Sequence, residues 1–368
     1  MTLDEVDPEA RAILERHGFE AECFEMLRSG LADGTRTVHG NVVQGVVEPP
    51  LPSDLTVLPT PGDPGFDEAV EAGTTALRAG TIAMVVLAGG MATRFGGGVK
   101  ATAEAIDGRS FLDVKLGETH RLASALDTEI PAAVMTSFAT DAVVRAHVAE
   151  RELGQPLWFC QTAAPRLRPD GSLFLGADQK ASLYGPGHGD LLSTIRVSGT
   201  LDELVRLGVR SVVVSNVDNL GARIDPVVVG MHVLAGTPLT VEVVAKGGDT
   251  GGAPARVDGR PQLLEAMRFP PGFDQSRIPV FNTNTSLITV EALAETFELT
   301  WLLAEKRVED QAVVQFERLY HELSAYLSTT FLVVPRQGLR GRFLPVKEPT
   351  DLAEVQPLLR EMLATSPV

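Results

Sequence analysis

From residue 81 onward, short runs rich in valine and isoleucine alternate with amphipathic stretches of helical length. A short apolar run between turn residues is typical of a buried strand, and apolar residues three or four apart indicate a helix. The runs predict strands at residues 82–87, 132–135, 211–214, 239–244 and 286–290. The amphipathic stretches predict helices at residues 111–125, 141–152, 199–207 and 308–327. This alternation predicts an α/β fold with an open, doubly wound, mostly parallel sheet.

The N-terminal region lacks this alternation. Residues 1–46 read as helical and then irregular, and Asp7-Pro8-Glu9 is a good helix start, because proline fits the first turn and acids favour the positive end of the dipole. Residues 47–65 contain six prolines, so we expect a linker or wrapping segment without regular structure. A helix is predicted at residues 66–79.

Composition narrows the class of protein. The chain has 368 residues, 44% of them apolar, and a net charge of −16, which disfavours a nucleic-acid binder held by counterion release. Its two cysteines, Cys23 and Cys160, lack metal-type spacing and are expected to be reduced. No apolar run is long enough to cross a bilayer and the acidic start does not resemble a signal peptide, so we expect a cytoplasmic protein without membrane partners.

Candidate chemistry begins just after the first predicted strand, in the glycine-rich segment at residues 87–100. Ligands of open α/β sheets bind beyond the carboxyl ends of the strands, and glycines there let backbone N–H groups approach a polyphosphate. Arg94 and Lys100 add positive charge. The spacing matches neither G-x-G-x-x-G nor G-x-x-x-x-G-K-[ST], so a dinucleotide fingerprint and a P-loop are both absent. A flexible loop without function is the alternative.

Lysine is rare in this chain, which has only six lysines among its 32 basic residues. Lysine is a compact point charge suited to phosphate. Lys100, Lys246 and Lys347 all stand in contexts that suggest strand ends, although any one of them could be a solvated surface lysine. A third element, residues 212–221, delivers Asp218 to a strand end. Its carboxylate could hold Mg²⁺ or simply form an Asx-turn.

Together these residues carry a family resemblance. The chain resembles the eukaryotic-type UTP–glucose-1-phosphate uridylyltransferases and the related UDP-N-acetylhexosamine and UDP-sugar pyrophosphorylases. Seven motifs occur in the family's order across roughly residues 81–355, so a chance match is excluded in practice. They are the Leu87–Lys100 loop, Thr136–Thr140, Gln161–Pro165, Gly187-His188-Gly189-Asp190, Ser215–Gly221, Phe281-Asn282-Thr283-Asn284 and Arg342–Lys347.

The resemblance implies a fold and a domain organisation. It implies a Rossmann-like, GT-A-like nucleotidyltransferase core at residues 81–350, with a sugar-binding insertion around residues 230–290. An N-terminal helical and wrapping segment at residues 1–80 and a C-terminal helix at residues 351–368 complete the expected organisation. The chain ends soon after Lys347 and Val99 replaces the family's proline, so we expect a short, divergent bacterial member that lacks the family's appended β-helix.

The resemblance also assigns roles to individual residues. The expected catalytic residues are Arg94, Lys100 and Lys347, which would hold phosphates. The nucleotide would contact Leu87, Gly89, Gly90, Thr93, Gln161, Gly189 and Asp218, and Asp218 would also bind Mg²⁺. The sugar phosphate would contact His188, Asn216, Lys246, Glu265, Asn282 and Asn284. Lys246 is the weakest assignment, because the segment after it is shortened relative to the family.

The implied reaction joins an NTP, by default UTP, to a sugar 1-phosphate, by default glucose 1-phosphate, and releases pyrophosphate. The enzyme would position two polyanions and neutralise their charge, with no nucleophilic side chain required. GTP or ATP with a specialised sugar or cyclitol 1-phosphate is one alternative, and a non-catalytic nucleotide-sugar-binding paralogue is another. We expect a monomer or dimer.

Overall fold

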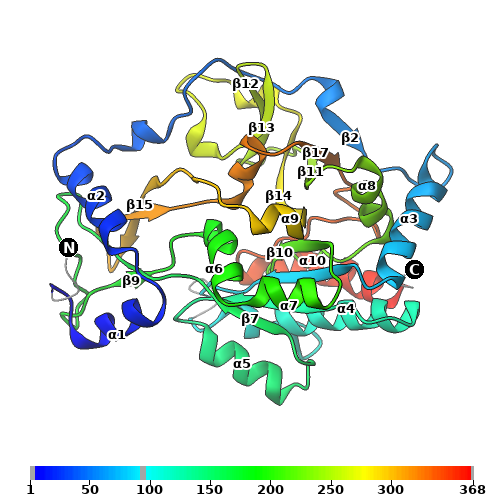
Figure 1. Cartoon of the computed structure of the whole chain (residues 1–368), viewed down its shortest axis with the longest axis horizontal. Coiled ribbons are helices and arrows are strands. Elements are labelled where there is room, and N and C mark those ends of the chain that lie inside the picture. Colours follow the sequence, from blue (N-terminus) through cyan, green and yellow to red (C-terminus); the bar gives the residue numbers. More distant parts are fainter. Residues whose placement is uncertain (1–4, 92–96, 366–368) are drawn as a thin grey trace.

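A computed structural model describes residues 5–91 and 97–365 of the chain. At its centre is an eight-stranded sheet in the order β2-β17-β11-β14-β10-β3-β6-β7 (Figure 1). Strand β14 runs antiparallel to both of its neighbours, whereas the other neighbouring pairs are parallel. The strands are β2 (Leu55–Val57), β3 (Ile82–Leu87), β6 (Ala132–Thr136), β7 (Leu157–Cys160), β10 (Ser211–Asn216), β11 (Leu239–Ala245), β14 (Val280–Thr289) and β17 (Thr329–Val333).

Helices cover both faces of this sheet, as the predicted α/β class requires. Side chains along β3 alternate between the two faces of the sheet. Ile82, Met84 and Val86 pack into one core cluster. Ala83, Val85 and Leu87 pack into the other. On the first face lie α3 (Phe66–Arg78), α4 (Phe111–Leu126), α5 (Asp141–Glu150), α8 (Pro226–Ala235) and α10 (Pro349–Ala364). On the second face lie α6 (Leu191–Val197), α7 (Thr200–Arg206) and α9 (Val290–Ala294).

Smaller elements surround the sheet. A three-stranded sheet joins β1 (Val47–Glu48), β12 (Ala253–Val257) and β13 (Arg260–Leu264), and it lies at the top of the view in Figure 1. Two-stranded pairs are formed by β4 (Glu104–Ile106) with β5 (Arg109–Ser110), β8 (Ala164–Pro165) with β9 (Leu183–Tyr184), and β15 (Leu302–Val308) with β16 (Gln311–Glu317). Near the N-terminus, α1 (Pro8–Arg16) is capped by Asp7, as predicted, and is followed by α2 (Ala21–Ala32).

Two predictions about secondary structure were wrong. The stretch at residues 308–327 is not a helix, because its first half completes the β15–β16 hairpin and its second half forms the 3-10 helix η9 (Tyr320–Ala325). The hairpin turns at Glu309 and Asp310, both with positive φ. Neither residue is glycine or asparagine, so the usual hairpin signal is missing from the sequence.

The proline-rich segment was predicted to lack regular structure, yet it supplies the edge strand β2, which pairs with β17. The three residues of β2 contain no proline, and an edge strand tolerates prolines nearby because only one side must hydrogen-bond.

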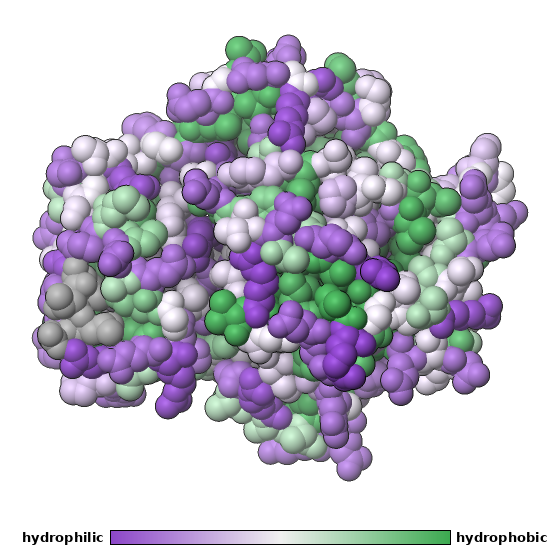
Figure 2. Space-filling model, viewed as in Figure 1, coloured by the Kyte–Doolittle hydropathy of each residue, from purple (hydrophilic) through white to green (hydrophobic). Residues whose placement is uncertain are grey.

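Polar residues cover most of the face shown in Figure 2, and hydrophobic residues reach the surface there in separate groups. Among the described helices, none combines the length and apolar character needed to cross a membrane.

Candidate active site

A cavity of about 440 Å³ opens at the carboxyl ends of β3, β6 and β10, where the topology predicts a ligand site. Nine of the residues expected from the sequence line this cavity: Leu87, Gly89, Gly90, Lys100, Gln161, His188, Asn216, Asp218 and Lys347. Segments separated by up to 260 positions along the chain therefore line the same cavity. Thr93 and Arg94, also expected here, lie outside the described residues.

One side of the cavity is formed by Gln161 and the glycines around it. The side-chain amide of Gln161 donates to the Gly187 carbonyl (2.8 Å), which fixes the orientation of the amide. A Cβ added to Gly89 would stand 2.5 Å from Gln161 Oε1 and one added to Gly185 would stand 2.9 Å from it. Any side chain at Gly89 would therefore displace the amide, which explains why glycine is needed at this position.

Charged groups gather around Asp218. The Nζ of Lys100 donates to the Val346 carbonyl (2.6 Å), and the Val346 N–H donates to the Asp218 carbonyl (3.0 Å). These bonds bring the next residue, Lys347, to the same wall. Burial raises the pKa of Asp218, and the positive charges of Lys100, Lys115 and Lys347 oppose that rise. The arrangement concentrates positive charge around one carboxylate, which suits a polyphosphate together with a metal ion.

Lys115 on α4 was not singled out from the sequence. It is 4% exposed, and its Nζ donates to the Ser215 hydroxyl (2.9 Å), the Asn219 carbonyl (2.5 Å) and the Ala222 carbonyl. Burial lowers the pKa of Lys115 to about 7, and the nearby Asp218 opposes the shift. The scarcity of lysine in the chain is the signal that could have drawn attention to it.

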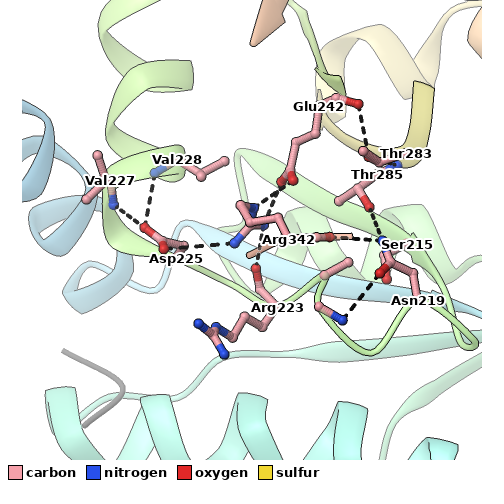
Figure 3. Close-up of polar contacts among 12 residues, drawn as sticks. Ser215, Asn219, Arg223, Asp225, Val227, Val228, Glu242, Thr283, Thr285 and Arg342 are labelled. Carbon is pink, nitrogen blue, oxygen red and sulfur yellow. Dashed lines mark hydrogen bonds and ion pairs between the residues drawn. The ribbon is translucent and has the colours of Figure 1, made fainter. Parts of the chain in front are cut away.

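The loop that carries Asp218 is also tied to the segment that carries Lys347 (Figure 3). Asn219 links them, because its Nδ2 donates to the Arg342 carbonyl (3.1 Å) and its Oδ1 accepts from the Leu344 N–H (2.9 Å). Arg342 in turn forms a buried ion pair with Glu242 on β11 (2.6 Å). Paired and hydrogen-bonded in this way, the arginine fixes the path of residues 342–347 over the sheet.

A second group of polar residues lies beside His188 and carries little charge. The ligand atoms of His188, Glu265 and His321 all lie within 4.8 Å of one another. The Nδ1 of His188 accepts from the Tyr320 N–H (3.2 Å), so a neutral ring presents its Nε2 as a donor. Burial lowers the pKa of His188 to about 4 and raises the pKa of Glu265 to about 7. His321 is fully buried.

Asn282 extends this group. Its Nδ2 donates to Asn284 Oδ1 (2.8 Å) and lies 3.3 Å from His321 Nδ1. The Oε1 of Glu265 is buried and has no hydrogen-bond partner among the described residues. A buried acceptor without a donor is costly, so this atom is suited to a ligand hydroxyl. Glu265, Asn282 and Asn284 do not line the main cavity itself but stand behind His188, which does.

Two further expected residues also stand outside the cavity lining. Gly189 is buried, its N–H donates to the Arg318 carbonyl (2.8 Å), and a Cβ there would stand 2.6 Å from Arg318. The Nζ of Lys246 donates to the Gln275 carbonyl (2.8 Å). The structure therefore gives Lys246 a local partner instead of a place among the cavity residues.

Comparisons with known proteins bear on this arrangement. The family described as UTP–glucose-1-phosphate uridylyltransferase matches residues 68–363. The chain is 30% identical over 303 residues to the UTP–glucose-1-phosphate uridylyltransferase of Saccharomyces cerevisiae, and the match covers 75% of this chain and 59% of the yeast protein. It is 31% identical over 294 residues to the enzyme of that name from Astragalus penduliflorus, with 75% and 62% covered. The chain thus spans about three fifths of the length of these relatives.

Solved structures agree with the fold. A UDP-glucose phosphorylase from Trypanosoma brucei superposes with a TM-score of 0.72 at 25% identity, covering 93% of this chain and 77% of the other. The uridine diphosphate N-acetylglucosamine pyrophosphorylase from the same organism gives a TM-score of 0.78 at 17% identity, covering 96% and 80%. The similarity extends over nearly the whole described chain.

Proposed function

The chain belongs to the UTP–glucose-1-phosphate uridylyltransferase family, and we propose that it transfers a uridylyl group from UTP to a sugar 1-phosphate, with glucose 1-phosphate as the first candidate. A phosphate oxygen of the sugar phosphate attacks the α-phosphorus of UTP and forms the new P–O bond. The bond between the α-phosphorus and the β-phosphate oxygen breaks, and pyrophosphate leaves. The products are a UDP-sugar and pyrophosphate.

The observation that carries this proposal is the meeting of Lys100, Asp218 and Lys347 in one cavity at the ends of the central strands. Two polyanions repel each other strongly, so a catalyst for their reaction needs fixed positive charge that costs no reorganisation. Lys100 is anchored through the Val346 carbonyl, and the Lys347 backbone N–H donates to Asp351 (2.7 Å), so both lysines start from fixed positions.

The donor set also fits Mg²⁺, which prefers oxygen ligands and keeps several of its positions for water and phosphate. Asp218 is the residue that would hold the ion, and Asn216 offers an amide oxygen in the same wall. When bound, Mg²⁺ would neutralise charge on the phosphates. Lys115, held behind the loop, keeps Asp218 in position by binding the Asn219 and Ala222 carbonyls.

For the uracil, the proposal uses Gln161 and the backbone at Gly89 and Gly90, which line the inner part of the cavity. For the sugar hydroxyls, it uses Glu265, Asn282 and His188. The unpartnered Oε1 of Glu265 supports this assignment, because a sugar hydroxyl that donates a hydrogen bond to this buried oxygen would give it the partner that it lacks.

The experiment is pyrophosphate release with Mg²⁺ across UTP, GTP, ATP, CTP and dTTP, each paired with a panel of sugar and cyclitol 1-phosphates. We expect the highest rate with UTP and glucose 1-phosphate. A highest rate with another pair would support the same type of reaction but with substrates other than UTP and glucose 1-phosphate. No release with any pair, from protein that binds UTP, would overturn the enzymatic proposal in favour of a nucleotide-sugar-binding protein.

A further inference from the structure

A second cavity, of about 460 Å³, lies among α3, α4, α10, the start of α8 and the loop at residues 339–340. Among the described residues, none lines both this cavity and the candidate active site. Part of its wall is rigid, because α3 and α8 touch backbone to backbone: a Cβ on Gly73 would stand 1.8 Å from the Pro226 carbonyl oxygen, and one on Gly230 would stand 1.8 Å from that of Ala69. Nothing in the proposed reaction uses this cavity.

Three arginines line it, Arg121, Arg223 and Arg340, against two acidic residues. Both acids already have partners. Glu118 forms an ion pair with Arg121 (2.6 Å), and Asp225 caps α8 by accepting from the Val227 N–H (2.8 Å). Among the described residues, the guanidinium groups of Arg223 and Arg340 are therefore left to face the cavity without a paired carboxylate.

These two arginines contact uncharged groups. Arg223 Nη2 donates to the Leu339 carbonyl (2.7 Å), and Figure 3 shows its guanidinium directed away from the Arg342–Glu242 pair. Arg340 stands over the Phe66 ring (5.4 Å to the centroid), and its Nη1 is buried without a hydrogen-bond partner among the residues described. No carboxylate among the described residues lies within ion-pair distance of either arginine.

The electrostatic environment points the same way. Burial and then the positive charge of Arg342 lower the pKa of Arg223, and the negative charges of Asp225 and Glu118 compensate only in part. Placing an anion between Arg223 and Arg340 would relieve this excess of positive charge. Guanidinium groups bind phosphate in a bidentate manner, which favours a phosphate over a single carboxylate.

The rest of the wall is mostly apolar and includes Phe66, Val70, Leu122, Ile224, Val227 and Met362. A cavity that combines an apolar wall with a few convergent polar groups is typical of a small-molecule site. From this combination we propose that the cavity binds a small phosphorylated ligand with an apolar or ring portion, its phosphate between Arg223 and Arg340 and its ring against Phe66.

The position of the site connects it to the active site. The Arg223 carbonyl accepts from Arg342 Nη2 (2.7 Å), and Arg342 begins the segment that ends at Lys347. Arg223 itself follows Asp218 in the same loop. A ligand that holds Arg223 and Arg340 together would therefore restrain both segments and change the KM of the reaction. This kinetic consequence rests on the proposed function, whereas the binding itself does not.

The test uses phenyl phosphate as the probe and isothermal titration calorimetry on the full chain, in the presence of saturating UTP and Mg²⁺ so that the active site is occupied. We expect phenyl phosphate to bind, and to bind more tightly than inorganic phosphate or benzyl alcohol. The variants Arg340→Gln and Arg223→Gln should each weaken binding by about 10- to 100-fold, the value of one charge-assisted hydrogen bond or two. Arg206→Gln, at an exposed ion pair on α7, is the matched control and should bind as the unmodified chain does.

Several outcomes would overturn the proposal. They are no binding of phenyl phosphate, binding that occurs only when UTP is left out, equal binding by Arg340→Gln, and equal affinity for inorganic phosphate. If binding is found, saturating phenyl phosphate should also change KM for a substrate by about fivefold in the unmodified chain, and leave it unchanged in Arg340→Gln. Failure of the proposed reaction would abolish this kinetic readout but not the calorimetric one, so the two failures are distinguishable.

Discussion

The two sides of the candidate active site differ in how they use charge. Around Asp218, Lys100 and Lys347 supply positive charge to an open cavity. Around Glu265, burial keeps the imidazoles of His188 and His321 neutral and raises the pKa of the carboxyl group to about 7. The first group suits phosphates, which need charge. The second suits hydroxyls, which need hydrogen bonds with fixed directions and no strong field.

This difference indicates how the site would distinguish the phosphate end of a sugar phosphate from its sugar ring. If the sugar side were cationic, a phosphate could occupy it and bind in the wrong orientation. A cluster whose imidazoles are neutral and whose carboxyl group adds no positive charge offers donors and acceptors to a hydroxyl but gives a phosphate dianion nothing to offset its desolvation. If one side binds phosphates and the other binds sugar hydroxyls, substitutions on the two sides should have different kinetic effects.

Removing charge from the phosphate side should have the largest effect. Lys347→Ala is expected to lower kcat/KM by about 100- to 1000-fold, as is typical for the loss of one preorganised group that stabilises a transition state. Steady-state pyrophosphate release would measure it. Lys306→Ala is the matched control, since Lys306 pairs with Glu317 on the β15–β16 hairpin away from the cavity. An equal loss in both variants would contradict a specific role for Lys347.

Asp218→Asn should act through the metal ion. We expect the Mg²⁺ concentration for half-maximal activity to rise by at least about 10- to 100-fold, because even residues that only support a metal ligand have effects of that size. A Mg²⁺ titration of activity, preceded by removal of metal with EDTA, would measure it. An unchanged titration curve would show that the ion, if required, is held elsewhere.

On the sugar side, Asn282→Ala should raise KM for the sugar 1-phosphate by about tenfold, the value of one buried hydrogen bond to a neutral group, and leave KM for UTP unchanged. Initial rates with each substrate varied in turn would separate the two constants. A larger rise in KM for UTP than for the sugar phosphate would contradict the assignment of Asn282 to the side that binds the sugar.

Much of this arrangement could be predicted from the sequence, because the relevant residues follow strands. Gly89 and Gly90 follow β3, while Asn216 is the last residue of β10 and Asp218 follows it. Parallel strands bring their carboxyl ends to one edge of the sheet. Lys115 could not be predicted in this way, since it lies in the middle of α4 and its three partners are about 100 positions away.

The sugar side was harder to foresee for the same physical reason. His321 lies in a stretch that reads as helical, and only the antiparallel pairing of β15 with β16 carries that part of the chain back under His188. The helix predicted at residues 308–327 failed because Val313 and Phe316 are buried by cross-strand packing, which a local pattern does not reveal.

The smallest expected effect concerns pH and stability. With its folded-state pKa raised from 4.5 to about 7, Glu265 holds its proton more tightly in the folded than in the unfolded chain. Its contribution to stability is therefore fully present below pH 4.5 and is lost as the pH rises to about 7. Glu265→Gln removes this dependence, so between pH 5 and pH 7.5 the Tm of the unmodified chain should fall by a few degrees relative to the variant. Parallel Tm curves would mean that Glu265 titrates normally.

The most direct test of the two-sided site is a crystal structure of the chain with a UDP-sugar. We expect the uracil beside Gln161, the diphosphate between Lys100 and Lys347, and the sugar hydroxyls on Glu265 and Asn282. A sugar ring lodged among the lysines, or a diphosphate placed against His188 and His321, would contradict the account.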